Sequence, residues 1–200
     1  MNPLLSVKGS LITGFVIAIL FAVLAVDGGW NELGLARWLH IIAGITWIGL
    51  LYYFNAVQVP ALAEAAADKG GPGGAGITKY VAPRALLWFR WAAVATWFTG
   101  AWYLLRAGTF VAAFTLGLGG EAFNTYGFVI GTGMWLGTIM LFNVWVLIWP
   151  NQKKILGIVP ATDEQKAAAR KTALYASRIN YILSIPMLLC MGGATHGLPF

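Results

Sequence analysis

The stretch LARWLHIIAGITWIGLLYYFNAVQV, residues 35–59, contains a single formally charged residue, Arg37. A helix needs about 20 mainly apolar residues to cross the hydrocarbon core of a bilayer, so we expect Leu35–Val59 to span a membrane. Four further stretches satisfy the same rule: Leu11–Val26, Pro83–Leu105, Tyr126–Trp149 and Ala173–Gly193. The sequence therefore predicts an all-α polytopic membrane helix bundle with five transmembrane helices, in which residues 1–200 form a single transmembrane domain.

The composition supports this class. The chain is 59% hydrophobic and 10% charged, with a mean hydropathy of +0.73, whereas a soluble domain carries roughly 25% charged residues. Cys190 is the only cysteine, which excludes an intrachain disulfide, a CxxCH haem-attachment motif and a thiolate metal cluster.

The net charge of +6 comes from basic residues whose distribution along the chain indicates the membrane topology. With the N-terminus inside and five crossings, only Arg37 and Arg106 fall on the outer side, and the C-terminus is outside. The other basic residues all fall on the inner half: Lys8, Lys69, Lys79, Arg84, Arg90, Lys153, Lys154, Lys166, Arg170, Lys171 and Arg178. This asymmetry follows the positive-inside rule. The basic residues are therefore expected to face anionic lipid, and no nucleic-acid partner is predicted.

Shorter features complete the expected bundle. Thr109–Leu118 is apolar but too short to cross, so we expect an interfacial or re-entrant piece. Thr162 and Gln165 resemble a capping box, which predicts a helix starting near Asp163. Pro186 should kink the last span.

Two glycine ridges lie in the fourth predicted span, Gly127-x-x-x-Gly131 and Gly133-x-x-x-Gly137. Small residues at this spacing let another helix or a flat ligand approach the backbone closely. Helix packing is the simpler interpretation of the two.

The two histidines of the chain are expected at the same depth near the outer surface. Val59 marks the inner end of the span that carries His40, and Arg178 marks the inner side of the span that carries His196. At 1.5 Å per residue the stretches between these markers and the histidines are about 28 and 27 Å long. Imidazoles on facing helices are suitable axial ligands for haem iron. Alternatively, an interfacial histidine bonds water or lipid headgroups.

Further residues on the face of His40 are assigned to the same cofactor site. Ala43 and Gly44 leave room beside the ring for a porphyrin edge, and Trp47 also lies along this face. Arg37 lies one turn further out and is placed to pair with a haem propionate. We therefore predict b-type haem held by His40 and His196, with Arg37, Gly44 and Trp47 around it.

Polar residues from four spans form a second predicted site on the inner half. Polar side chains within a span usually face the bundle interior, and two arginines among carboxamides suit a small planar anion. The alternative is bonding to backbone carbonyls, lipid phosphates or Glu64. The predicted substrate-binding residues are Asn55, Arg90, Asn143, Arg178 and Asn180.

Several long motifs resemble the membrane domain of bacterial membrane-bound urate oxidases, which are linked to cytochrome c. The motifs are Arg37–Gly49, Tyr52–Asn55, Gln58–Pro60, Pro83–Trp91, Gly133–Trp145, Trp149–Lys154 and Ser177–Met187, followed by His196. The core His40-x-x-x-Gly44-x-x-Trp47-x-Gly49 is also similar, more distantly, to haem-binding membrane protoporphyrinogen oxidases and copper-resistance membrane proteins.

This resemblance implies a membrane oxidoreductase of the bacterial cytoplasmic (inner) membrane that oxidises urate or a similar planar substrate. The urate enzymes carry a cytochrome c domain, and this chain has no CxxCH. Electrons are therefore expected to pass toward a separate outer-face acceptor, such as cytochrome c or a respiratory complex. The alternatives are a non-catalytic accessory subunit of a larger membrane complex or oligomer, with the glycine ridges and aromatic faces as docking surfaces, and a copper-handling or porphyrin-handling protein.

Overall fold

Two compact units make up the chain, Met1–Glu32 and Leu33–Phe200. The computed structural model describes residues 2–25 and 29–199, and every regular element in those ranges is helical. The predicted all-α class is therefore confirmed. The interpretation of residues 1–200 as one domain stays a prediction.

The first unit contains a 3-10 turn, η1 (Pro3–Leu5), and one helix, α1 (Val7–Ala25). The Asn2 side chain accepts a hydrogen bond from the Leu4 N–H and caps the turn. Helix α1 has 19 residues, which is long enough to cross the hydrocarbon core of a bilayer. The predicted span Leu11–Val26 is helical as far as Ala25, and Val26 lies outside the described residues.

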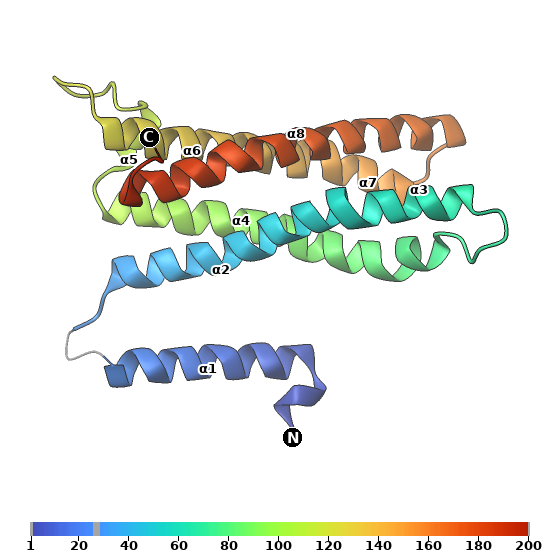
Figure 1. Cartoon of the computed structure of the whole chain (residues 1–200), viewed down its shortest axis with the longest axis horizontal. Coiled ribbons are helices and arrows are strands. Elements are labelled where there is room, and N and C mark those ends of the chain that lie inside the picture. The colour runs from blue at the N-terminus through green and yellow to red at the C-terminus, as the bar shows by residue number, and fades with distance from the viewer. Residues whose placement is uncertain (1, 26–28, 200) are drawn as a thin grey trace. The chain divides into compact units, whose positions relative to one another are not determined.

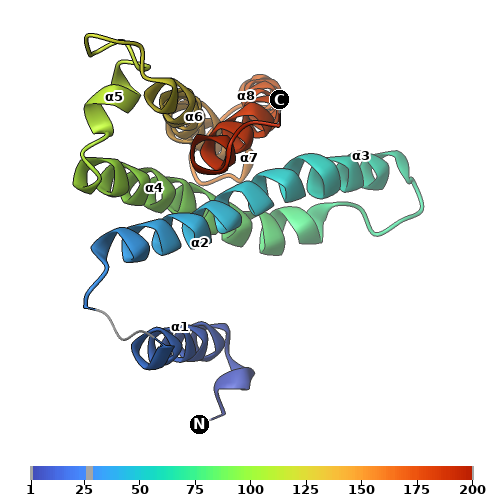
Figure 2. The same cartoon turned by 60° about the vertical axis from the view of Figure 1, so that its left-hand side comes forward.

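In the second unit, long helical segments run alternately in opposite directions (Figures 1 and 2). The first segment is α2 (Glu32–Tyr53), which continues through the π-helical turn η2 (Phe54–Gln58) into α3 (Val59–Ala67). The second is the π-helical turn η3 (Ile77–Val81) and α4 (Ala82–Arg106), followed by the short α5 (Phe110–Phe114). The third is α6 (Thr125–Phe142), the π-helical turn η4 (Asn143–Ile148) and α7 (Trp149–Ile155). The fourth is α8 (Asp163–His196).

The alternation gives the second unit two distinct ends (Figure 1). We call the end with α3, η3, α7 and the first turns of α8 the basic end. The opposite end, with α5, the first turns of α2 and the last turns of α4 and α8, is the histidine end. Arg37 on α2 and Arg106 on α4 belong to the histidine end. The basic residues at or next to the elements of the basic end are Lys69, Lys79, Arg84, Lys153, Lys154, Lys166, Arg170 and Lys171.

Each π-helical turn stops just before a proline. A proline inside a helix lacks an N–H and clashes with the carbonyl four residues earlier. The wider π turn moves that carbonyl away, and such turns are common at functional positions. The pairs are η2 with Pro60, η3 with Pro83 and η4 with Pro150. In α8 the helix runs through Pro186 without a π turn, and a kink there stays a prediction.

Helix boundaries follow the capping signals in the sequence. The Thr162 side chain accepts from the Gln165 N–H, and the Gln165 side chain accepts from the Thr162 N–H. This reciprocal pair is the predicted capping box, and it starts α8 at Asp163. The stretch Thr109–Leu118 forms only the short helix α5, so it does not cross the bundle.

The core is built from aromatic and long aliphatic side chains of the long helices. Trp47, Phe89 and Met140 come from α2, α4 and α6, and each is nearly inaccessible to solvent. Phe54 meets Phe89 edge to face with ring centroids 5.4 Å apart, a favoured aromatic geometry. These contacts hold three of the long segments together.

The glycine ridges pack within the chain. A Cβ added at Gly127 would lie 2.9 Å from the Ala112 carbonyl oxygen, and one at Gly131 would overlap the Ala113 carbonyl oxygen. A Cβ at Gly133 would lie 3.1 Å from the Cys190 Cβ on α8. The packing interpretation of the ridges is therefore confirmed at these three positions, whereas Gly137 meets no atom within 4 Å.

By length and composition, four helices among the described residues can cross a membrane: Val7–Ala25, Glu32–Ala67, Thr125–Ile155 and Asp163–His196. The predicted membrane helix bundle is therefore confirmed. The predicted span Pro83–Leu105 corresponds to α4 and is not among the four, because its tryptophans and Arg90 lower its hydropathy. Five crossings, with the N-terminus inside and the C-terminus outside, stay a prediction.

Candidate functional site

His40 lies on the face of α2 that points into the bundle. The same face carries Ala36, Trp47 and Leu51, which are almost fully buried. The His40 Nδ1 atom is 2.8 Å from the backbone carbonyl oxygen of Thr96 on α4. A carbonyl oxygen can only accept, so Nδ1 carries a proton, and in the neutral imidazole the lone pair is on Nε2.

The ring of His40 is also held by close contact with α4. A Cβ added at Gly100 would lie 2.8 Å from His40 Cε1 and 3.0 Å from Nδ1. Only a residue without a side chain at position 100 lets the imidazole approach this closely. Within the described residues, His40 Nε2 has no hydrogen-bond partner. A histidine whose Nδ1 bonds a carbonyl and whose Nε2 is free has the usual arrangement of a metal-ligating histidine.

His196 is the last residue of α8 and is exposed. The helix stops there because Gly197 adopts a φ of 86°, which other residues rarely adopt. No hydrogen bond or ring contact of His196 occurs among the described residues, and none joins it to His40. Both its ring nitrogens are thus free of protein partners within that part of the chain.

The relative heights of the two histidines follow from a contact between α2 and α8. Tyr52 and Tyr181 pack with ring centroids 4.6 Å apart, and Ser184 Oγ lies 3.4 Å from the Tyr52 hydroxyl. The stretch from Tyr52 back to His40 is as long as the stretch from Ser184 on to His196. Each helix rises about 18 Å over its stretch toward the histidine end. By this count His40 and His196 lie at equal distances, along their own helices, from the contact between Tyr52 and Ser184.

The other predicted cofactor residues on α2 have distinct surroundings. Arg37 donates a hydrogen bond from Nη2 to the Tyr103 hydroxyl at 2.8 Å, and its guanidinium carbon lies 5.1 Å from the centroid of the same ring. Gly44 faces Thr96, with 3.7 Å between an added Cβ and the Thr96 methyl group. Trp47 is 2% exposed and its indole N–H has no acceptor within the described residues. An unpaired buried donor of this kind is uncommon in proteins.

Three of the five predicted substrate residues are buried carboxamides. Asn143 Nδ2 donates to Asn180 Oδ1 at 2.8 Å, and Asn180 Nδ2 donates to the Met140 carbonyl at 3.0 Å. Asn55 Nδ2 lies 2.9 Å from both the Leu51 carbonyl oxygen and the Ser177 hydroxyl. The Asn143–Asn180 pair thus joins η4 to α8, and Asn55 joins η2 to α8.

The two predicted arginines have different environments. The Arg90 guanidinium lies 3.8 Å from the centroid of the Trp149 ring, an arrangement that stabilises a cation over an indole face. Arg178 is exposed. No hydrogen bond within the described residues joins either guanidinium to a carboxamide of the cluster. Their role in substrate binding stays a prediction.

Sequence reasoning did not assign roles to several residues that complete these sites. Thr96, Gly100 and Tyr103 of α4 contact the α2 residues described above, and no spacing rule pairs them with α2. Gln58 is 8% exposed, and its Oε1 has no hydrogen-bond partner in the described part of the chain. The Oδ1 atom of Asn55, one turn earlier, is buried and unpaired there as well. An amide so close to Asn55 in an apolar span is a signal that could have identified Gln58.

Clustered metal ligands do not occur in the described ranges: no group of three or more His, Cys, Asp or Glu side chains lies close enough to hold an ion.

The helical bundle and its long apolar segments define an integral membrane protein of the multi-pass class. The family model described as urate oxidase N-terminal matches residues 28–116 and 107–200. The chain therefore belongs to the urate oxidase N-terminal family, as its motifs indicated. No curated protein matches the chain, and no solved structure does. The more distant similarity to protoporphyrinogen oxidases and copper-resistance proteins stays a prediction.

Proposed function

We propose that this chain is a haem b-binding redox protein of the urate oxidase N-terminal family, with His40 and His196 as the iron ligands. The observation that carries the proposal is the bond from His40 Nδ1 to the Thr96 carbonyl. In the neutral imidazole that bond puts the lone pair on Nε2, and a backbone carbonyl partner of this kind orients a ligating imidazole and raises its basicity.

The residues around His40 are compatible with a large planar cofactor. Ala36, Ala43 and Gly44 are small, so the face of α2 on either side of the ring carries little bulk. The Trp47 N–H is a buried donor without an acceptor among the described residues, and Arg37 carries a permanent cation at the histidine end. Trp47 would contact the cofactor, and Arg37 would pair with a propionate carboxylate. When bound, haem supplies one-electron transfer.

The buried carboxamides are the proposed substrate region. Membership of the urate oxidase N-terminal family favours urate or a similar planar compound, and a quinone head group is the other ligand of suitable shape. Asn55, Asn143 and Asn180 would orient its ring by hydrogen bonds, and Arg90 and Arg178 would supply positive charge. Electrons removed from the substrate would leave toward an acceptor at the outer face of a bacterial cytoplasmic membrane, such as a cytochrome c.

The test is an absorption spectrum of the purified full-length protein, reduced minus oxidised, with a pyridine haemochrome assay. We expect a b-type spectrum in the unsubstituted protein and loss or a shift of the Soret band in His40→Ala and in His196→Ala. Thr96→Ala is the matched control, because it keeps the carbonyl that bonds Nδ1 and should leave the spectrum unchanged. A protein without haem absorbance, or unaltered spectra in both histidine variants, would overturn the proposal.

An accessory subunit of a larger membrane complex is the alternative function. Its expected docking surfaces are the glycine ridges and aromatic faces, and Gly127, Gly131 and Gly133 meet atoms of other segments of the same chain. These three glycines are therefore not available to a partner. Isolation of a stoichiometric partner together with a haem-free chain would favour the alternative.

A further inference from the structure

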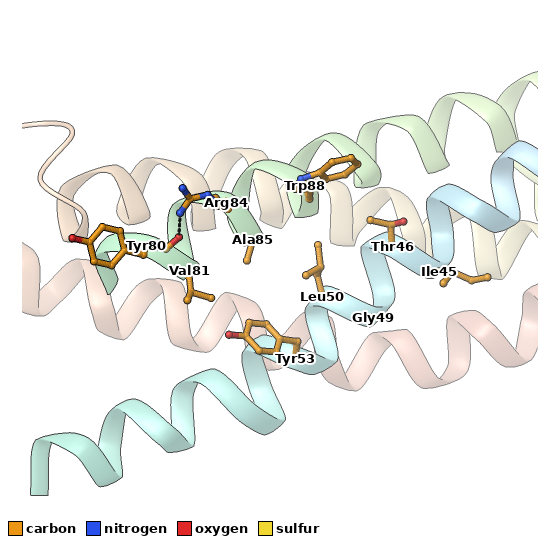
Figure 3. A pocket seen from close by; sticks show the side chains of 10 residues that line it. All are labelled: Ile45, Thr46, Gly49, Leu50, Tyr53, Tyr80, Val81, Arg84, Ala85 and Trp88. Carbon is orange, nitrogen blue, oxygen red and sulfur yellow. Dashed lines mark hydrogen bonds between the residues drawn. The ribbon is translucent and has the colours of Figure 1, made fainter. Parts of the chain in front are cut away.

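An open groove of about 710 Å³ runs between α2 and the η3–α4 segment, and its lining includes none of the predicted site residues described above. Its lining is Ile45, Thr46, Gly49, Leu50, Tyr53, Tyr80, Val81, Arg84, Ala85 and Trp88. Figure 3 shows Tyr80 and Arg84 at one end of the groove and Ile45 at the other. The volume is in the range of small-molecule sites, roughly 300–1,000 Å³.

The groove is apolar along most of its length. Ile45, Leu50, Val81 and Ala85 offer only hydrocarbon, and the Thr46 hydroxyl bonds the Ile42 carbonyl of its own helix at 3.2 Å. A Cβ added at Gly49 would meet no atom within 4 Å, so the absent side chain leaves open space in the groove. An aliphatic chain fits such a surface, because it buries hydrocarbon without leaving a polar group unpaired.

One end of the groove is polar and basic. Arg84 donates to the Tyr80 carbonyl and makes no ion pair within the described residues, so its other N–H groups are free for an anion. Lys79 is adjacent and lies over the Tyr80 ring, with its ammonium 5.3 Å from the centroid. The Tyr53 and Tyr80 hydroxyls have no hydrogen-bond partner in the described part of the chain. A guanidinium with free donors is suited to a phosphate.

We propose that this groove binds an anionic phospholipid, with its phosphate at Arg84 and one acyl chain along Gly49 and Ile45. Arg84 selects an anion over a neutral isoprenoid or sterol, because its charge is permanent. The position at the basic end also suits this ligand, since basic pockets between membrane helices recognise anionic headgroups. This site is independent of haem and substrate.

The test is native mass spectrometry of the full-length protein in mild detergent, with phosphatidylglycerol and phosphatidylcholine of identical acyl chains added as competing probes. We expect the unsubstituted protein to retain phosphatidylglycerol preferentially. Arg84→Gln should lower the ratio of the two bound lipids about fivefold, the effect of one basic residue near an anionic surface. Gly49→Leu should remove both lipids, because its side chain would occupy the stretch of the groove along which the acyl chain lies.

Two matched controls separate the site from general effects. Arg170→Gln removes an exposed cation elsewhere at the basic end and should leave the ratio of bound phosphatidylglycerol to bound phosphatidylcholine unchanged. Gly49→Ala adds one methyl group in open space and should keep binding. If Gly49→Leu does not fold, Ala85→Leu blocks the groove from the facing helix.

Three outcomes would overturn the proposal. The first is unchanged phosphatidylglycerol binding in both blocking variants. The second is an equal fall in the ratio for Arg84→Gln and Arg170→Gln, which would mean general charge attraction. The third is a neutral lipid bound in the groove and insensitive to Arg84→Gln.

Discussion

The imidazole of His40 is fixed to α4 at two points, the Thr96 carbonyl oxygen 2.8 Å from Nδ1 and the backbone at Gly100. The bond to Thr96 sets the tautomer, and the close approach at Gly100 sets the ring position. A ring constrained in this way is preorganised to present Nε2 in one direction. This differs from a histidine that only meets water or lipid headgroups, which would keep several orientations.

Gly100→Ala should displace the His40 ring. The added Cβ would lie 2.8 Å from His40 Cε1, so the ring or the α2–α4 packing must shift, at a cost of about 1–3 kcal/mol. We expect a lower unfolding temperature and a shifted Soret band. Gly192→Ala is the control, because nothing lies within 4 Å of its Cβ. An unchanged spectrum in Gly100→Ala would mean that the ring position does not matter for the cofactor.

Asn180→Leu should destabilise the bundle interior. Asn180 accepts from Asn143 and donates to the Met140 carbonyl, and its loss removes both of these bonds from a buried region. The expected cost is about 1–3 kcal/mol in the free energy of unfolding. Arg178→Gln, nearby on α8 and exposed, should change stability by less than about 0.5 kcal/mol. Thermal unfolding in detergent measures the stability of both variants. Equal losses of stability would contradict the hydrogen bonds assigned to Asn180.

The double variant Asn143→Leu with Asn180→Leu extends this test. If the two carboxamides act as a pair, the second substitution costs less than the first, because its partner is already absent. We expect the double variant to be less destabilised than the sum of the single variants. Strict additivity would show that the two side chains do not interact.

Gln58→Leu and Asn55→Leu should have different effects on stability, although both remove a buried amide of η2. Asn55 contacts the Leu51 carbonyl and the Ser177 hydroxyl, and its removal should cost about 1–3 kcal/mol. Gln58 Oε1 has no partner among the described residues, so Gln58→Leu should leave stability unchanged or raise it. A large loss of stability in Gln58→Leu, seen in thermal unfolding, would indicate that the oxygen has a bound partner.

Gly131→Ala should separate α5 from α6. Its Cβ would overlap the Ala113 carbonyl oxygen, which is backbone and cannot rotate away. We expect a destabilisation of at least about 1–3 kcal/mol. At Gly137 on the same helix a Cβ meets no atom within 4 Å, so Gly137→Ala should gain up to about 1 kcal/mol from its higher helix propensity. Unfolding temperatures of the two variants, compared directly, test the contact.

Local signals predicted the elements of this chain well. Thr162 and Gln165 form the predicted capping box, and the apolar run at Leu35–Val59 is helical throughout. The ridge Gly127-x-x-x-Gly131 packs closely, as its small residues indicated. Each of these features depends on a short stretch of neighbouring residues, which a sequence displays directly. The π-helical turns before Pro60, Pro83 and Pro150 also have a local cause, although the pattern of apolar residues did not indicate them.

The sequence by itself determined that this is a helical membrane protein, because apolar length and the distribution of charge require no knowledge of packing. It also singled out His40 and the buried asparagines as unusual residues in apolar helices. Only the tertiary structure decided that His40 bonds Thr96, that Arg90 lies over Trp149, and that a groove opens beside Arg84. Each of these relations joins residues of different helices that are far apart in the sequence, and periodicity along one helix carries no information about the rotation of its neighbour.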